Sequence, residues 1–153
     1  MAEVVKAVDL DGGVLVGYDG SPASEAALRW ASGIARRLDE PLHVLRAWGM
    51  MNAPVPATKQ GGYIPPLVDW EGAVRDELEA KIGRMELDCD LRLHVVHDQA
   101  SAALLHAAKG AHLLVVARRG AGGFRGLGFG STADQVARHS PCPVVVVPVD
   151  GHA

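Results

Sequence analysis

Short apolar runs alternate with stretches of helical period along this chain of 153 residues, and this alternation constrains the fold most strongly. The runs are mostly continuous, which is typical of strands covered on both faces, and each run except the last precedes a helical pattern. This β-α order predicts an open parallel sheet with helices on both sides. The expected strands are residues 14–16, 42–47, 91–95, 111–116 and 144–147, and the expected helices are residues 22–39, 68–87, 102–109 and 131–139.

The helix ends and helix faces carry their own signals. Ser21 followed by Pro22 predicts an N-cap and a first helical position. Gly110 predicts a C-terminal cap, and Ser131 with Asp134 three residues later matches a capping box. The apolar face is expected at Ala23, Ala27, Trp30, Ala31, Ile34 and Leu38 in the first helix and at Trp70, Val74, Leu78, Ile82 and Met85 in the second.

Length and composition fit one globular domain, expected at residues 13–149 after a flexible arm at residues 1–12. Residues 48–66, rich in Pro and Gly, predict a long loop, either a lid or partner surface or a disordered insertion.

The formal net charge of −3 provides no overall basic field, so neither nucleic acid nor a membrane is expected as a partner. A cytoplasmic location is expected, because we find no secretory leader, no membrane-length apolar run and no CxxC motif.

A glycine-rich stretch at residues 117–131 joins the fourth expected strand to the fourth expected helix. Glycine lets the backbone approach a ligand closely, and a helix N-terminus presents unpaired N–H groups and the positive end of a dipole. Arg118, Arg119 and Arg125 add positive charge that suits phosphate. The stretch therefore predicts a site for a phosphate-bearing ligand, and the alternative is a flexible surface loop with solvated arginines.

The expected sheet provides a second, separate reason to place a ligand there. Ligands of open α/β sheets bind at the carboxyl ends of strands, where the strand order reverses. If the first strand is central, this point lies between the first and fourth strands, which brings Tyr18 and Asp19 beside the glycine-rich stretch. The chain contains no Walker A motif, no G-x-G-x-x-G after the first strand and no G-x-S-x-G elbow, which disfavours P-loop NTPases, dinucleotide-binding Rossmann domains and α/β-hydrolases.

Four segments carry a resemblance to a known family. They are the opening residues 14–21, Leu42-His43-Val44, the closing residues 141–147, and the spacing G-x2-G-x9-G-[ST]. The last falls on Ala117, Gly120, Gly130 and Ser131, with alanine in place of the first glycine. With these segments the chain resembles the universal stress protein family over nearly its whole length.

The resemblance implies a flavodoxin-like, three-layer α/β/α domain, similar to the adenine nucleotide alpha hydrolases, with strand order 3-2-1-4-5. It implies a site for ATP or a related adenine nucleotide, which Mg²⁺ can accompany. In that site Asp19 would lie near the ribose, and the main chain of Val44 would face the adenine. Gly120, Gly130, Ser131 and Thr132 would line the phosphates, and Gly17, Val116, Ala117 and Arg118 complete the expected set. The resemblance also implies a homodimer joined through the last strand, Val144–Val147, whose open edge suits pairing.

The leading functional hypothesis is a nucleotide-binding regulator of stress response without catalytic residues, whose occupied and empty forms present different surfaces to a protein partner. Ala117 and Arg118 favour the alternative of a dimeric interaction module that has lost its nucleotide, because a positive φ at Ala117 would cost about 1–2 kcal/mol. A slow ATP phosphohydrolase is a third hypothesis, with Asp19 as its available base. The seven histidines show no ligand spacing, so no metal site is expected.

Overall fold

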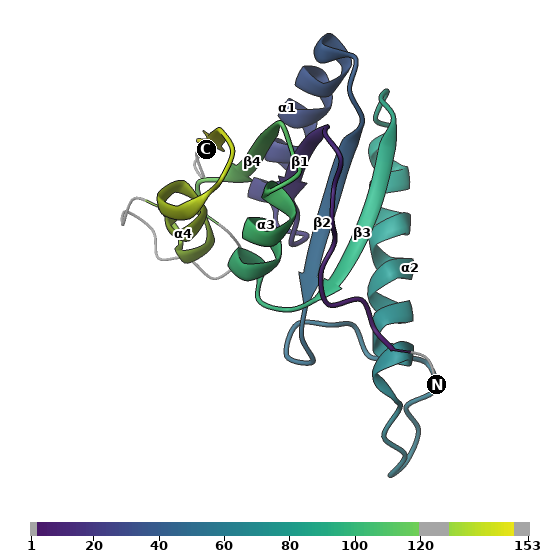
Figure 1. The fold of residues 1–153 in the computed structure, drawn as a ribbon. Coiled ribbons are helices and arrows are strands. Elements are labelled where there is room, and N and C mark those ends of the chain that lie inside the picture. Colours follow the sequence, from purple (N-terminus) through teal and green to yellow (C-terminus); the bar gives the residue numbers. More distant parts are fainter. Residues whose placement is uncertain (1–2, 120–128, 149–153) are drawn as a thin grey trace.

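One parallel sheet organises the protein, whose computed structural model describes residues 3–119 and 129–148 (Figure 1). The strand order is β3-β2-β1-β4-β5, which confirms the order expected from the family resemblance. β1 lies at the centre, with Val16 opposite Val44 of β2 and Val115 of β4. The strands are β1 (Val14–Gly17), β2 (Leu42–Trp48), β3 (Leu91–His97), β4 (Leu113–Ala117) and β5 (Val144–Val147). The helices are α1 (Pro22–Leu38), α2 (Leu67–Met85), α3 (Ala100–Ala108) and α4 (Ser131–His139).

The helices form a layer on each side of the sheet, which confirms the three-layer α/β/α prediction (Figure 1). α1 and α2 pack on one face, and α3 and α4 pack on the other. This division follows from right-handed crossovers, because the chain moves along the sheet in one direction from β1 to β3 and in the other from β4 to β5. Among the described residues, no helix has both the length and the apolar character needed to cross a membrane.

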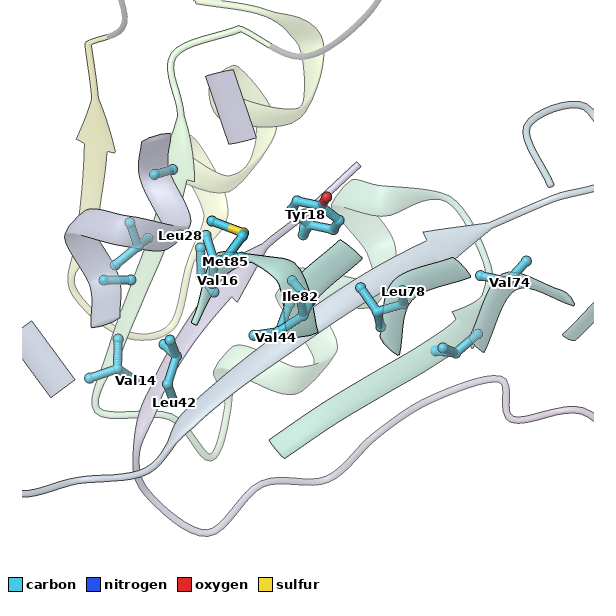
Figure 2. Close-up of a cluster of buried hydrophobic side chains, with 14 of the residues drawn as sticks. Val14, Val16, Tyr18, Leu28, Leu42, Val44, Val74, Leu78, Ile82 and Met85 are labelled. Atoms are coloured by element: carbon cyan, nitrogen blue, oxygen red, sulfur yellow. The ribbon is translucent and has the colours of Figure 1, made fainter. Parts of the chain in front are cut away.

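The larger part of the core lies between the sheet and the α1–α2 layer, and Figure 2 shows its side chains interdigitating. The predicted apolar stripe of α2 is confirmed in full, since Trp70, Val74, Leu78, Ile82 and Met85 are all buried. Val14, Val16 and Val44 meet this stripe from the sheet. Trp48 is also part of the core at 1% exposure, so it ends β2 rather than opening the long loop as predicted.

The predicted apolar face of α1 is confirmed in part: Ala27 and Ala31 are buried and Ile34 packs against the core, whereas the outer members of the face are wrong. Trp30 and Leu38 were expected inside and are 41% and 54% exposed. The residues that α1 buries are Ser24, Ala27, Leu28, Ala31, Ser32 and Ala35. These positions follow helical spacing too, but most carry small side chains, which let the helix axis come close to the sheet. The prediction included the large side chains of Trp30 and Leu38, and it omitted the buried residues Ser24, Leu28, Ser32 and Ala35.

The predicted start of α1 is confirmed, whereas the predicted start of α4 and the predicted end of α3 differ from the structure. The Ser21 side chain accepts a hydrogen bond from the Ser24 N–H at 3.1 Å, and Pro22 begins the helix. In α4 the N-cap is Gly130, without a side-chain bond, and Asp134 instead pairs with Arg138 at 3.0 Å, so the predicted capping box is absent. Ser131 is therefore the first residue of the helix, whereas the motif requires it to be the N-cap.

Gly110 is required by a close approach rather than by a C-terminal cap, since the cap of α3 is Lys109 in right-handed conformation. A Cβ at Gly110 would overlap the carbonyl group of Leu10. The carbonyl oxygen of Gly110 accepts from the Gly12 N–H at 2.6 Å. Glycine is therefore the residue that lets the N-terminal segment pass against the end of α3.

The N-terminal segment, residues 3–12, runs along the protein from one end of the sheet to the other (Figure 1). Near its start, the Val5 N–H donates to Glu71 Oε2 of α2 at 2.8 Å, and the Val5 carbonyl accepts from the His97 N–H of β3 at 2.8 Å. Further along, Val8 and Leu10 pack against the α3–α4 core. The flexibility expected for residues 1–12 stays a prediction, and the structure adds the contacts that any movement would break.

Candidate functional site

A cavity of about 230 Å³ opens at the carboxyl ends of the central strands, where the strand order reverses. Its β1–α1 and β4–α4 walls contain Gly17, Tyr18, Asp19, Ser24, Val116, Ala117, Arg119, Thr132 and Ala133. Its β2 and β3–α3 walls contain Leu45, Arg46, Ala47, Asn52, Asp98, Gln99, Ala100 and Leu104. The convergence of the β1 and β4 ends on one crevice, predicted from the sequence, is thus present in the part of the chain that the structure describes.

The β1–α1 turn holds the carboxylate of Asp19 at the cavity. Asp19 Oδ1 accepts from the Ser21 N–H at 2.9 Å, and the Asp19 N–H donates to Ser24 Oγ at 3.3 Å. Gly17, just before the turn, forms part of the floor, and a Cβ there would lie 2.9 Å from a terminal methyl of Leu104. The turn therefore orients Asp19 through backbone bonds and keeps the floor free of side-chain bulk.

Tyr18 supports this turn from the core side. It is 4% exposed, and its hydroxyl donates to Glu25 Oε2 at 3.3 Å. Burial and the adjacent Glu25 carboxylate raise the pKa of Tyr18 to about 12. The phenol is therefore neutral at physiological pH and serves as a hydrogen-bond donor rather than as a base.

Arg46 connects the cavity to the long loop between β2 and α2. Its side chain is buried, with Nη1 donating to the carbonyl of Ala47 at 3.1 Å and Nη2 donating to the carbonyl of Asn52 at 3.0 Å. Glu77 Oε1 of α2 lies 4.0 Å from Nη2. Asn52 Oδ1 in turn accepts from the Gly49 N–H at 2.9 Å, so the first turn of the loop is fixed against the cavity wall.

The β4–α4 wall presents the N-terminus of α4. Thr132 and Ala133, in its first turn, line the cavity together with Arg119. The positive end of the helix dipole and the guanidinium favour an anionic group at this end. Among described residues other than glycine, positive φ occurs at Asp39 and Glu86, so Ala117, the last residue of β4, is free of the backbone strain considered above.

The structure brings together part of the predicted site. Gly17, Asp19, Val116, Ala117 and Thr132 all line the cavity. Val44 does not: it is fully buried in mid-strand, and β2 contributes its last residues instead. Arg118, Gly130 and Ser131 flank the wall without lining it, and the Gly130 N–H is engaged with the Arg118 carbonyl at 2.7 Å. Gly120 lies outside the described residues.

Sequence reasoning missed the β2 and β3 contributions, although a usable signal existed. The carboxyl ends of neighbouring parallel strands meet at one edge of the sheet, so residues after the second and third strands belong at the cavity as much as Asp19 does. On this rule Arg46, Ala47, Asp98 and Gln99 were accessible to prediction. Asn52 was not, because its place depends on the Arg46 side chain.

Two histidines pair across strands away from this cavity. His43 Nδ1 and His94 Nε2 lie 2.9 Å apart with stacked rings, so one neutral ring donates to the other. Burial lowers the pKa of His43 and lowers the pKa of His94 to about 4, with the neighbouring ring as a further cause for His94. Within the described ranges, no three His, Cys, Asp or Glu side chains are grouped to hold a metal ion.

The fold and cavity define an open, parallel α/β domain with a ligand cavity at its topological switch point. A sequence profile described as the universal stress protein family matches residues 13–148. The chain therefore belongs to the universal stress protein family, which confirms the resemblance found in the sequence.

Curated relatives support this membership and are longer than the chain. A universal stress protein of Mycolicibacterium smegmatis is 36% identical over 141 residues, which is 88% of this chain and 45% of that protein. A universal stress protein of Mycobacterium tuberculosis is 34% identical over 140 residues, which is 87% of this chain and 43% of that protein. The chain thus spans less than half of the length of these relatives.

Solved structures of the family share the fold. Universal stress protein UspA from Lactobacillus plantarum has a TM-score of 0.66 at 22% identity, over 92% of this chain and 99% of that one. A universal stress protein solved in complex with cAMP has a TM-score of 0.59 at 26% identity, over 92% of this chain and 98% of that one.

Proposed function

We propose that the cavity binds ATP or a related adenine nucleotide and that the protein acts as a ligand-dependent regulator of stress response. The observation that carries the proposal is the cavity itself, which combines an anion-favouring helix N-terminus at one end with apolar side chains, among them Leu45, Ala47 and Leu104, at the other. The structure of a family member in complex with cAMP, 26% identical to this chain, supports an adenine nucleotide as the ligand class.

The two ends of the cavity suit the two ends of a nucleotide. Thr132, Ala133 and Arg119 favour the phosphates, which Mg²⁺ accompanies in the triphosphate. Leu45, Ala47 and Leu104 offer an apolar surface for the base. A cavity of about 230 Å³ lies just below the range of roughly 300–1,000 Å³ for small-molecule sites and suits a single nucleotide better than a dinucleotide.

Regulation would pass through the long loop after β2, residues 49–66. Its first turn lines the cavity at Asn52, whereas its distal part carries exposed apolar side chains and projects beyond the sheet (Figure 1). These side chains are Val55, Tyr63 and Ile64, and Met50 and Met51 are exposed apolar side chains within the first turn. A ligand that contacts Asn52 differently from solvent would shift the loop, and with it the apolar surface that a protein partner meets.

The remaining elements of the proposal are the absence of turnover, pairing and location. Asp19 Oδ1 is engaged with the Ser21 N–H, which favours a positioning role over that of a general base.

A second copy would pair along β5, Val144–Val147, which has β4 as its neighbour in the described sheet. Light scattering measures the molar mass in solution: we expect twice the mass of one chain, and the mass of a single chain would contradict the pairing. The protein would act in the cytoplasm, which fractionation of cells tests.

A nucleotide assay tests the proposed function directly. Purified protein is denatured and the supernatant chromatographed, and stripped protein is then titrated calorimetrically with AMP and with ATP, with and without Mg²⁺. We expect released adenine nucleotide or saturable binding near one ligand per chain, without phosphate release above a blank. No released nucleotide and no heat with either ligand would contradict the proposal and favour a nucleotide-free interaction module that uses the exposed loop.

A further inference from the structure

We propose that Asp98 reads the exocyclic amine of the base and makes the cavity prefer 6-amino purines over 6-keto purines. This inference rests on the proposed function and adds to it the residue that selects the base. Asp98 follows β3 and precedes α3, and it lines the same cavity as Asp19 and Thr132.

The position of Asp98 in the sheet places it at the base end of the ligand. The anionic end belongs to the β4–α4 wall, where α4 begins and Arg119 lies. β3 is separated from β4 by β2 and β1, which is three strand spacings or roughly 14 Å. A nucleotide with its phosphate over α4 therefore directs its base toward β2 and β3, where Ala47, Ala100 and Leu104 can contact the ring.

The chemistry of Asp98 then decides which edge of the base fits. Oδ1 accepts from the Gln99 N–H at 2.7 Å, which orients the carboxylate in the turn. Among the described residues no hydrogen bond involves Oδ2, so this oxygen can accept from a ligand. An ionised carboxylate has no proton to donate, so it favours an amine and opposes a carbonyl at the same position. Gln99, whose amide both donates and accepts, would tolerate either group.

A comparison of two ligands and two variants tests the proposal. AMP and IMP carry the same ribose and phosphate and differ at position 6, where AMP has an amine and IMP a carbonyl. By calorimetry we expect wild-type protein to bind AMP about tenfold more tightly than IMP, the effect of one charge-assisted hydrogen bond at an exposed site. Asp98→Asn keeps an oxygen for the Gln99 N–H and offers an N–H to the ligand, so the AMP-to-IMP ratio should fall to about one.

Asp88→Asn is the matched control, because Asp88 is exposed and pairs with Arg36 at 3.5 Å, outside the cavity lining. It makes the same chemical change and should leave the ratio at the wild-type value. Equal binding of AMP and IMP by wild-type protein would overturn the role of Asp98 while leaving the proposed function intact. An unchanged ratio in Asp98→Asn would also overturn it. If calorimetry detects no binding of AMP to wild-type protein, the proposed function itself is overturned.

Discussion

Thr132→Glu is expected to lower the affinity for AMP and ATP by roughly 100-fold without lowering the thermal stability. Thr132 lies in the first turn of α4 and lines the cavity at its anionic end. A carboxylate roughly 5 Å from a phosphate costs about 3 kcal/mol at an effective dielectric constant of about 20, which corresponds to that loss. The same carboxylate favours the positive end of the helix dipole, so the fold should keep or slightly gain stability.

The matched control for this prediction is Thr132→Gln, which has nearly the same size and no charge. Titration calorimetry and thermal unfolding of both variants separate the electrostatic effect from a steric one. We expect Thr132→Gln to bind within a few-fold of the wild-type protein. Equal affinity of the glutamate variant and the wild-type protein would show that phosphate does not bind at the N-terminus of α4.

Leu28→Ala is expected to lower the free energy of unfolding by about 3 kcal/mol, within the range of large-to-small substitutions at buried sites. Leu28 is fully buried in α1 and belongs to the core cluster against the sheet (Figure 2). Removing its side chain leaves a cavity that the packed layer closes only in part. Urea denaturation measures the loss, and thermal unfolding should show a fall of roughly 6–12 °C.

The control for Leu28 lies in the same helix. Leu38 is 54% exposed, so Leu38→Ala should change the free energy of unfolding by less than about 0.5 kcal/mol. The pair also tests the orientation of α1, because the sequence pattern placed Leu38 in the core and the structure does not. Similar destabilisation by both substitutions would contradict the packing of α1 described above.

The contrast between α1 and α2 shows what a sequence pattern can predict about a helix. In α2 the large apolar side chains recur at helical spacing and nothing competes with them, so the stripe through Val74 and Leu78 was predicted correctly. In α1 the buried face is built from alanine and serine except for Leu28, and small side chains such as those of Ala31 and Ser32 give a weak hydrophobic signal. Close packing, rather than hydrophobic size, selects that face.

The cavity was predictable where a rule of topology applied and not where distant segments meet. Asp19 and Val116 follow from the order of strands alone. Val44 was expected at the site from the family resemblance. However, β2 continues past Val44 to Trp48, so the carboxyl end of the strand, where the cavity lies, is formed by later residues. The requirement for glycine at position 110 depends on Leu10, about a hundred residues earlier, and no local pattern carries that information.

The course of residues 3–12 has a practical consequence for how the protein is handled. The segment begins beside α2 and the end of β3, next to the turn that carries Asp98, and finishes at the opposite end of the sheet near Gly110. An affinity tag or reporter domain joined ahead of residue 3 would therefore emerge at the end of the sheet that carries the cavity. A fusion there would report on crowding of the cavity mouth, and a fusion partner used only for purification should be removed before nucleotides are titrated.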